Sequence, residues 1–283
     1  MKEIDLKVEL IIPSYNRLDF LKGTLEKVRK LYPDLKICLG LQGNMPGSNL
    51  QSELDNDPML RIMRFAFPST TKTLNHCIAT SSADIVLLLD DDAVPYFGWL
   101  ESHIDAFASD AALTYTSGRE VRYSKNRSSL SEWVRIIIEA FFGLFMRSNK
   151  KIGGRIIGWF NKLGMLFGNF DKYGTCEINS PRGCNMAIRR EQFLKIGGFN
   201  TDFKSNAWGF EADFGLRMAR KGIYGKYIGD AIVVHYEISY GGSRTNKDIG
   251  FRDFVYNHKV LLRNLGPQAW IGSIPRLIKK RFF

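Results

Sequence analysis

The chain has 283 residues, of which 45% are apolar, and carries a formal net charge of +11. This length and apolar content exclude a disordered chain and a disulfide-stapled miniprotein, and they predict one large α/β domain or two small ones. The four cysteines, Cys38, Cys77, Cys176 and Cys184, form no CxxC pair and no metal-ligand spacing. We therefore expect buried, reduced thiols rather than a zinc or disulfide framework.

Two further features concern the location of the protein. No apolar run approaches the roughly 18–20 residues of a membrane span, and residues 1–5 do not resemble a signal peptide, so we expect a cytoplasmic protein. The positive charge is concentrated in residues 122–175, with a net charge of +7, and in residues 259–283, with +6. Because the rest of the chain is near neutral, a nucleic-acid-binding surface over the whole fold is not expected.

The first ninety residues alternate between two kinds of pattern. Short apolar runs bounded by turn residues predict strands, and apolar residues at helical spacing predict helices. The expected strands are residues 8–12, 36–41, 60–65 and 84–89, and the expected helices are residues 19–31 and 71–80. Strands that alternate with helices in this way predict a mostly parallel central sheet flanked by helices, an α/β fold.

Three aspartates, Asp90, Asp91 and Asp92, directly follow the most apolar of these strands. In open α/β sheets, ligands bind at the carboxyl ends of the strands. Adjacent carboxylates repel one another, and oxygen ligands of this kind suit Mg²⁺ or Mn²⁺. We therefore predict a divalent-metal site, with a solvated acidic turn as the alternative.

A second acidic pair, Glu211 and Asp213, opens a predicted helix that ends near Gly222. Acids in a first helical turn are favoured by the helix dipole, so capping is one explanation. The preceding Trp208 and Gly209 favour a close approach to a ligand instead. Both interpretations are open from the residues alone.

A histidine, His235, ends another apolar strand, residues 231–234. A lone histidine is most often structural, but an imidazole can also complete a metal site built by aspartates.

In this order, the motifs resemble family 2 glycosyltransferases, the inverting, nucleotide-sugar-dependent type with the GT-A fold. The resemblance covers about residues 6–120 and 176–245. The matching segments are Ile11-Ile12-Pro13-Ser14-Tyr15-Asn16-Arg17, Lys72-Thr73-Leu74-Asn75, Asp90-x-Asp92, Asn185 to Arg190 with Ile196 to Phe199, Gly209 to Arg217, and His235 with Ser243.

The resemblance implies roles for particular residues. The metal ligands would be Asp90, Asp92 and His235, and Glu211 would be the catalytic base, with Asp213 as second candidate for base or acceptor binder. The residues implied to bind the nucleotide-sugar donor are Pro13, Tyr15, Asn16, Arg17, Gln42, Lys72, Asn75, Asp90 and Asp91.

Two departures from the family pattern are visible. Gln42 and Asn44 stand where members commonly carry an aspartate that contacts the nucleotide base, so the sequence does not identify the base. Glu211 aligns with the usual catalytic aspartate, and Phe210 stands where the family has a glutamate.

The resemblance implies metal-assisted sugar transfer to a hydroxyl of a glycan or lipid-linked acceptor. Two alternatives remain. One is a haloacid-dehalogenase-like phosphatase with Asp90 as nucleophile, and the other is a catalytically inactive, membrane-associated scaffold of the same fold.

The organisation expected is a GT-A domain over residues 1–245 and a basic helical tail over residues 246–283. Within the domain, residues 122–175 are expected to form an inserted amphipathic helical segment. Two stretches, residues 133–146 and 155–167, combine cationic residues with Trp, Phe and Leu, which is typical of helices that lie in a membrane interface. Together with the basic tail they predict peripheral contact with anionic membrane at the inner face of the cell membrane. A helical hairpin packed on the acceptor side is the alternative.

Overall fold

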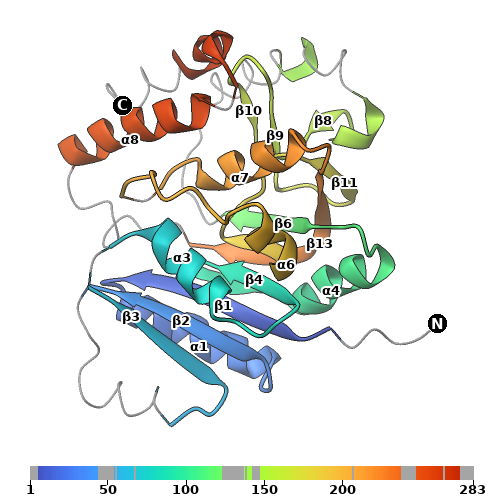
Figure 1. Ribbon diagram of the computed structural model, residues 1–283. Helices are drawn as coiled ribbons and strands as arrows, with labels where there is room; N and C mark the ends of the chain where they lie inside the picture. The colour runs from blue at the N-terminus through green and yellow to red at the C-terminus, as the bar shows by residue number, and fades with distance from the viewer. Residues whose placement is uncertain are drawn as a thin grey trace.

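The computed structural model of the chain describes residues 6–43, 54, 56–66, 68–122, 137, 139–141, 147–205, 207–236, 247–263 and 265–274. A large mixed sheet runs through the described part, with helices on both of its faces (Figure 1).

The first half of the chain supplies the parallel part of the sheet. The elements in this half are β1 (Val8–Tyr15), α1 (Leu18–Leu31), β2 (Lys36–Gln42), β3 (Leu60–Phe65), α3 (Thr70–Ala79) and β4 (Ile85–Leu89). β1 pairs in parallel with β2 and β4, and β2 pairs in parallel with β3. The carboxyl ends of these strands therefore lie at one edge of the sheet, and the predicted alternation of strands and helices is confirmed.

The second half extends the sheet with mixed pairing. Its strands are β5 (Ala93–Pro95), β6 (Tyr115–Arg122), β11 (Thr175–Ile178), β12 (Asn185–Arg189) and β13 (Gly225–His235). β12 joins the halves, because it runs antiparallel to β4 on one side and to β6 on the other. The sheet order is β11-β13-β6-β12-β4-β1-β2-β3, and β5 pairs with β13.

Two apolar layers hold the helices on the sheet, because alternate residues of each strand point to opposite faces. Leu10 and Ile12 belong to the same apolar cluster as Leu21 of α1, whereas Ile11 belongs to the cluster that contains Leu74 of α3 and Phe214. The remaining helices are α4 (Trp99–Ser109), α6 (Arg190–Lys195), α7 (Phe210–Ala219) and α8 (Lys247–Leu262), with 3₁₀ turns at Ser148–Lys150 and Pro267–Ala269. α4 shares the layer of α1, and α6 and α7 share the layer of α3.

A buried polar network fixes the second half beneath the site. The Asn185 side chain donates to the carbonyl of Ala231, 2.8 Å away, and accepts from the indole N–H of Trp99, also at 2.8 Å. His103 lies 3.0 Å from the same Asn185 oxygen and 2.8 Å from Thr116. Burial lowers the pKa of His103 to about 4, so its imidazole is neutral at physiological pH. The network therefore ties α4, β6, β12 and β13 together without a buried charge.

The helix expected over residues 155–167 is wrong. These residues form part of two small antiparallel hairpins, made by β7 (Lys151–Ile152) with β8 (Arg155–Ile156) and by β9 (Trp159–Phe160) with β10 (Leu166–Phe167). The hairpin turns use glycines with positive φ, at Gly153, Gly154 and Gly164, a conformation that an α-helix does not contain. The segment is therefore not an amphipathic helix over these residues.

A carboxylate within the insertion organises the first hairpin. Glu139 accepts hydrogen bonds from the Ile156 N–H at 2.7 Å and the Asn169 amide at 2.7 Å, and it pairs with Arg155 at 2.8 Å. Arg155, which was expected to face a membrane, therefore bonds within the domain.

Several expectations lie outside the described residues. They are those on Asn44, on most of residues 133–146, on Ser243 and on the tail residues 275–283. Among the residues that are described, no helix is long and apolar enough to span a membrane.

Candidate active site

The acidic turn after β4 presents its three carboxylates unequally. The side chain of Asp90 is 40% exposed, whereas Asp91 and Asp92 are buried. Ser14 of β1 donates to Asp91 at 2.6 Å, and Thr24 of α1 donates to the Asp91 carbonyl at 2.8 Å. Asp91 is therefore held inward against β1 and α1, and Asp90 faces the open edge of the sheet.

Arg17 forms ion pairs with both buried aspartates. Its guanidinium lies 2.5 Å from Asp91 and 2.9 Å from Asp92. Burial raises the pKa of Asp91 to about 7, although Arg17 and Ser14 oppose this effect. The loop after β1, where Arg17 lies, is thus tied to the acidic turn after β4.

His235, the last residue of β13, lies next to the same turn. Its Nε2 is 3.1 Å from Asp92 Oδ1 and 3.8 Å from Asp90 Oδ2. β13 reaches this position because His235 pairs with Ala93 of β5, and because Tyr236 N–H donates to the Asp92 carbonyl. The structure therefore brings the three predicted metal ligands together.

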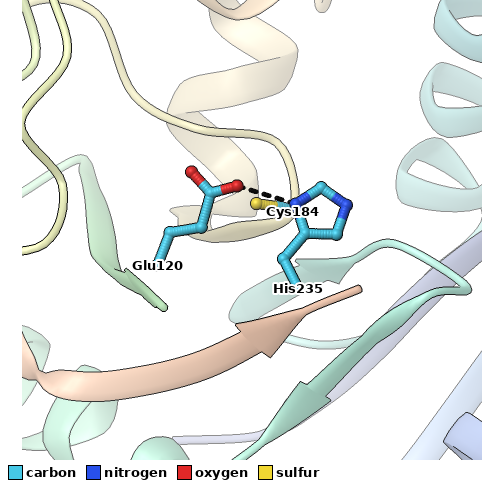
Figure 2. A group of neighbouring side chains, drawn as sticks. All are labelled: Glu120, Cys184 and His235. Carbon is cyan, nitrogen blue, oxygen red and sulfur yellow. Dashed lines mark hydrogen bonds and ion pairs between the residues drawn. The ribbon is translucent and has the colours of Figure 1, made fainter. Parts of the chain in front are cut away.

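The opposite nitrogen of His235 is held by Glu120 of β6. Glu120 Oε1 lies 2.7 Å from His235 Nδ1. Figure 2 shows the two side chains and the dashed line that joins them. Burial disfavours the charge of Glu120, but Arg182, His235 and Arg122 outweigh burial and hold its pKa well below the usual range. An ionised carboxylate only accepts hydrogen bonds, so Nδ1 carries the proton and Nε2 is directed at the aspartates.

The donor set of Asp90, Asp92 and His235 fits a divalent cation. One ligand atom from each residue lies within 4.8 Å of the others. Two carboxylates and one imidazole, with one carboxylate at the surface, suit a cation such as Mn²⁺ that keeps positions free for phosphate oxygens.

Glu120, Cys184 and His235 form a second group of potential ligands within 4.8 Å. Burial raises the pKa of Cys184 to about 11, so the thiol is protonated at neutral pH. Glu120 is already engaged by Arg182 at 2.8 Å. This group therefore orients His235 rather than offering a second cation site.

Glu211 lies at the start of α7, on the wall of a cavity of about 710 Å³. Its Oε1 accepts the backbone N–H of Gly183 at 3.1 Å. A Cβ at position 183 would lie 2.8 Å from this oxygen, so glycine is what permits the approach. Burial raises the pKa of Glu211 to about 7, a value suited to a general base.

Asp213 occupies a different environment. It is fully buried and pairs with Arg217 at 2.8 Å, and Arg217 also donates to the carbonyls of Ile196 and Gly198. Asp213 does not line the cavity that contains Glu211. Its visible role is to hold Arg217, which braces α7 against the end of α6.

The predicted donor residues at the ends of β1 and β2 are only partly brought together. Pro13 and Tyr15 end β1, and Asn16 follows with a positive φ of 54°. Gly43 packs against this turn, because a Cβ there would lie 2.2 Å from the Asn16 side-chain oxygen.

Gln42, the last residue of β2, is buried. Its side-chain oxygen accepts a hydrogen bond from the Ser69 N–H at 2.6 Å, so Gln42 anchors the start of α3.

The two predicted residues of α3 differ. Lys72 is exposed. Asn75 exchanges two hydrogen bonds of 2.8 Å with the backbone of Phe199 and thereby joins α3 to the loop after α6. The Asn75 side chain is thus engaged within the protein.

Sequence reasoning missed Glu120, Arg182 and Ser14. Glu120 and His235 are 115 residues apart, and only the pairing of β6 with β13 makes them neighbours. Arg122 and Arg182 are visible in the sequence, but nothing in it identifies Glu120 as the carboxylate that both of them contact.

Comparisons with known proteins agree with this architecture. Residues 9–197 match the model of glycosyl transferase family 2, and residues 169–237 match a model described as the N-terminal domain of galactosyltransferase. Chondroitin synthase from Escherichia coli is 23% identical over 252 residues, which are 81% of this chain and 34% of that protein. The chain thus spans about a third of the length of this relative.

Two solved structures share the fold. The crystal structure of GalNAc-T7 with UDP, GalNAc and Mn²⁺ has a TM-score of 0.62 at 12% identity, over 91% of this chain and 48% of that chain. The mannosyltransferase PcManGT from Pyrobaculum calidifontis, in complex with GDP-Man and Mn²⁺, has a TM-score of 0.58 at 16% identity, over 98% and 73%. The predicted GT-A fold is confirmed. Because the family model extends from β1 past α6, over most of the chain, the protein belongs to glycosyl transferase family 2.

Proposed function

We propose that the protein transfers a sugar from a nucleotide-sugar donor to a hydroxyl of a glycan or lipid-linked acceptor, with inversion at the anomeric carbon. One observation carries this proposal. Glu211 and Glu120 line the same cavity, and Glu120 holds His235 of the cation-binding group. The candidate base therefore lines a cavity of about 710 Å³, and the residue that orients a candidate cation ligand lines the same cavity.

Asp90, Asp92 and His235 would hold the divalent cation. When bound, Mg²⁺ or Mn²⁺ neutralises the diphosphate that departs from the sugar. Glu120 keeps Nε2 of His235 directed at the aspartates, and Arg17 fixes Asp92 from the other side.

Glu211 would act as general base. An acceptor oxygen forms the new bond to the anomeric carbon as the bond to the diphosphate oxygen breaks, and the hydroxyl proton passes to Glu211. A single displacement of this kind inverts the configuration and requires one base. The raised pKa of Glu211 and its place in the cavity wall favour it over Asp213, which is paired with Arg217.

The donor would lie over the carboxyl ends of β1 and β4, near Tyr15, Asn16 and Arg17. We expect Asp91, Gln42 and Asn75 to act indirectly, because each is engaged within the protein. The two structural neighbours hold UDP and GDP-Man respectively, so both nucleotides are candidates for this chain.

Membership of glycosyl transferase family 2 removes the reason for the phosphatase alternative. An inactive scaffold of the same fold remains testable, since such a protein would show no metal-dependent turnover of a sugar nucleotide.

The first experiment is calorimetric titration of UDP and of GDP into the purified chain, with Mn²⁺ and with chelator. We expect one nucleotide to bind, and to bind only with Mn²⁺. Asp92→Asn should abolish that binding, whereas Asp34→Asn, an exposed aspartate between α1 and β2, should retain it. Equal binding with chelator, or by Asp92→Asn, would contradict the cation assignment.

A further inference from the structure

Three arginines and three acids line the cavity beside Glu211, and the acids offset the charge of the arginines only in part. Arg119, Arg122 and Arg182 line it, together with Glu120, Asp171 and Glu211. Only a cation whose charge is not compensated within the protein would select an anionic ligand.

Glu120 is shared by several cations. Arg182 lies 2.8 Å from it, Arg122 lies 3.0 Å from it, and His235 Nδ1 lies 2.7 Å from it. One carboxylate thus faces two guanidinium groups and an imidazole, and the cluster is net positive.

The other two acids do not offset this charge. Asp171 pairs with Lys172 at 3.2 Å, and its side chain is 62% exposed, so water and Lys172 screen it. Glu211 has a pKa of about 7 and is therefore ionised only in part at neutral pH.

Of the three arginines that line the cavity, Arg119 has no acidic partner among the described residues. Its guanidinium lies 3.6 Å from the centroid of the Tyr173 ring, and its Nε is buried with no hydrogen-bond acceptor. Its backbone is fixed, since the Arg119 carbonyl accepts from Asn185 at 2.9 Å. Because Arg119 lines the cavity, the terminal N–H groups of its guanidinium can donate to a carboxylate or phosphate oxygen bound there.

The cavity also offers a surface for a sugar ring. Trp208 lines it and is held by a parallel stack on His258, with ring centroids 4.3 Å apart. A fixed aromatic wall beside an arginine suits a ring that carries a charged substituent.

We propose that the acceptor saccharide carries an anionic group close to the hydroxyl that is glycosylated, and that Arg119, supported by Arg122 and Arg182, binds this group. This inference rests on the proposed function, because it describes the acceptor of the same site. The anion is the carboxylate of an acidic sugar or the phosphate of a lipid-linked one.

The test compares matched ligands on the full chain with Mn²⁺ and the nucleotide that it binds. The first pair of probes is a tetrasaccharide that contains hexuronic acid and the same tetrasaccharide with its carboxyl groups reduced to hydroxyls. The second pair is a hexose linked through diphosphate to a short prenyl chain and the same hexose linked to that prenyl chain without phosphate. We expect one anionic probe to bind at least tenfold more tightly than its neutral partner, with a preference that weakens as salt rises, and the pair that shows it identifies the anion.

Variants locate the effect. Arg119→Gln should reduce the preference to near unity while the neutral probe binds as before, and Arg119→Lys should retain part of it. Arg263→Gln, an exposed arginine outside the cavity, should behave as wild type.

Equal binding of anionic and neutral probes, or no binding of any probe, would overturn this inference. If Mn²⁺-dependent nucleotide binding persisted in that case, the proposed function would stand and only the acceptor class would be wrong. Loss of nucleotide binding in the wild-type chain would instead overturn the proposed function.

Discussion

Glu120 Oε1 and His235 Nδ1 lie 2.7 Å apart, at the ends of two neighbouring strands that run in parallel. Glu120 pairs in register with Val233, and His235 pairs with Arg122. The two side chains therefore meet because β6 and β13 reach the site together.

This contact predicts that Glu120 controls cation affinity without touching the cation. Outer residues that orient a ligating histidine typically change metal affinity 10–100-fold. We expect Glu120→Gln to weaken Mn²⁺ binding by about this factor, measured by electron paramagnetic resonance of free Mn²⁺. Glu191→Gln, an exposed glutamate paired with Lys195, is the matched control and should leave the affinity unchanged. An unchanged affinity in Glu120→Gln would contradict the orienting role.

Variants of Glu211 and Asp213 distinguish which of the two carboxylates is the general base. Loss of a general base lowers kcat by roughly 10²–10⁴-fold. We expect this loss in Glu211→Gln, with nucleotide binding retained, in a transfer assay once an acceptor is identified.

Asp213→Asn is expected to act on stability instead. It would leave Arg217 without its buried carboxylate, so the melting temperature should fall. If Asp213→Asn removed activity at unchanged stability while Glu211→Gln stayed active, the base would be Asp213.

The raised pKa of Glu211 predicts the dependence of rate on pH. Below its pKa of about 7 the base is protonated, so kcat/KM should fall about tenfold per pH unit on the acidic side. The measurement is kcat/KM from pH 5 to 8. A rate that is constant over this range would contradict Glu211 as the base.

Glu211 also makes the stability of the protein depend on pH, because its pKa is higher in the folded chain than in the unfolded chain. Between the ordinary value of 4.5 and about 7, the folded chain holds the Glu211 proton more tightly than the unfolded chain does. The contribution of Glu211 to the free energy of unfolding therefore falls as the pH rises from about 4.5 to about 7. We expect the melting temperature of Glu211→Gln, relative to wild type, to increase from pH 5 to 8. A constant difference would show that Glu211 is not desolvated.

Peripheral membrane contact is expected from charge. Residues 259–283 contain six basic residues and no acidic residue. Each basic residue near an anionic surface contributes on the order of 1 kcal/mol to membrane binding. The protein should sediment with vesicles of anionic lipid at low salt and be released at high salt. Vesicles of zwitterionic lipid are the control. Deletion from Pro275 onward should weaken sedimentation, and a wild-type chain that stays in the supernatant would contradict the expectation.

The sequence predicted elements whose signal is local. β3 was expected at residues 60–65 and occupies Leu60–Phe65, because a short run of this kind is bounded by clear turn residues. β13 was expected only from residue 231, yet it begins at Gly225. The register shift between Ile228 and Ile232 explains the difference, since Gly229 and Asp230 interrupt the apolar pattern there.

The prediction of a helix over residues 155–167 was wrong for a related reason. Its apolar and cationic residues recur at a spacing compatible with a helix, but glycines at positions 153, 154, 158 and 164 take positive φ values. The amino-acid composition alone favours a helix, but Gly153, Gly154 and Gly164 form the turns of two hairpins instead.

Among the candidate cation ligands, Asp90, Asp92 and His235 could be proposed from the sequence because each comes at or after the end of an apolar strand, and the structure places them together. Gln42 and Asn75 matched the family pattern, but their partners, Ser69 and the backbone of Phe199, are set by tertiary packing. Contacts of this kind cannot be predicted from the spacing of residues in the sequence.

The position of β12 between β4 and β6 has a consequence for engineering. The aspartates belong to the parallel half of the sheet, while Glu120 and His235 belong to the half beyond β12. A chimaera that exchanged the first ninety-two residues for those of a relative, in order to change the donor, would bring foreign aspartates against a resident histidine. Such a chimaera would need the strand ends of both parents to agree in register. The segment that we propose to bind the donor can therefore not be exchanged independently of the rest of the sheet.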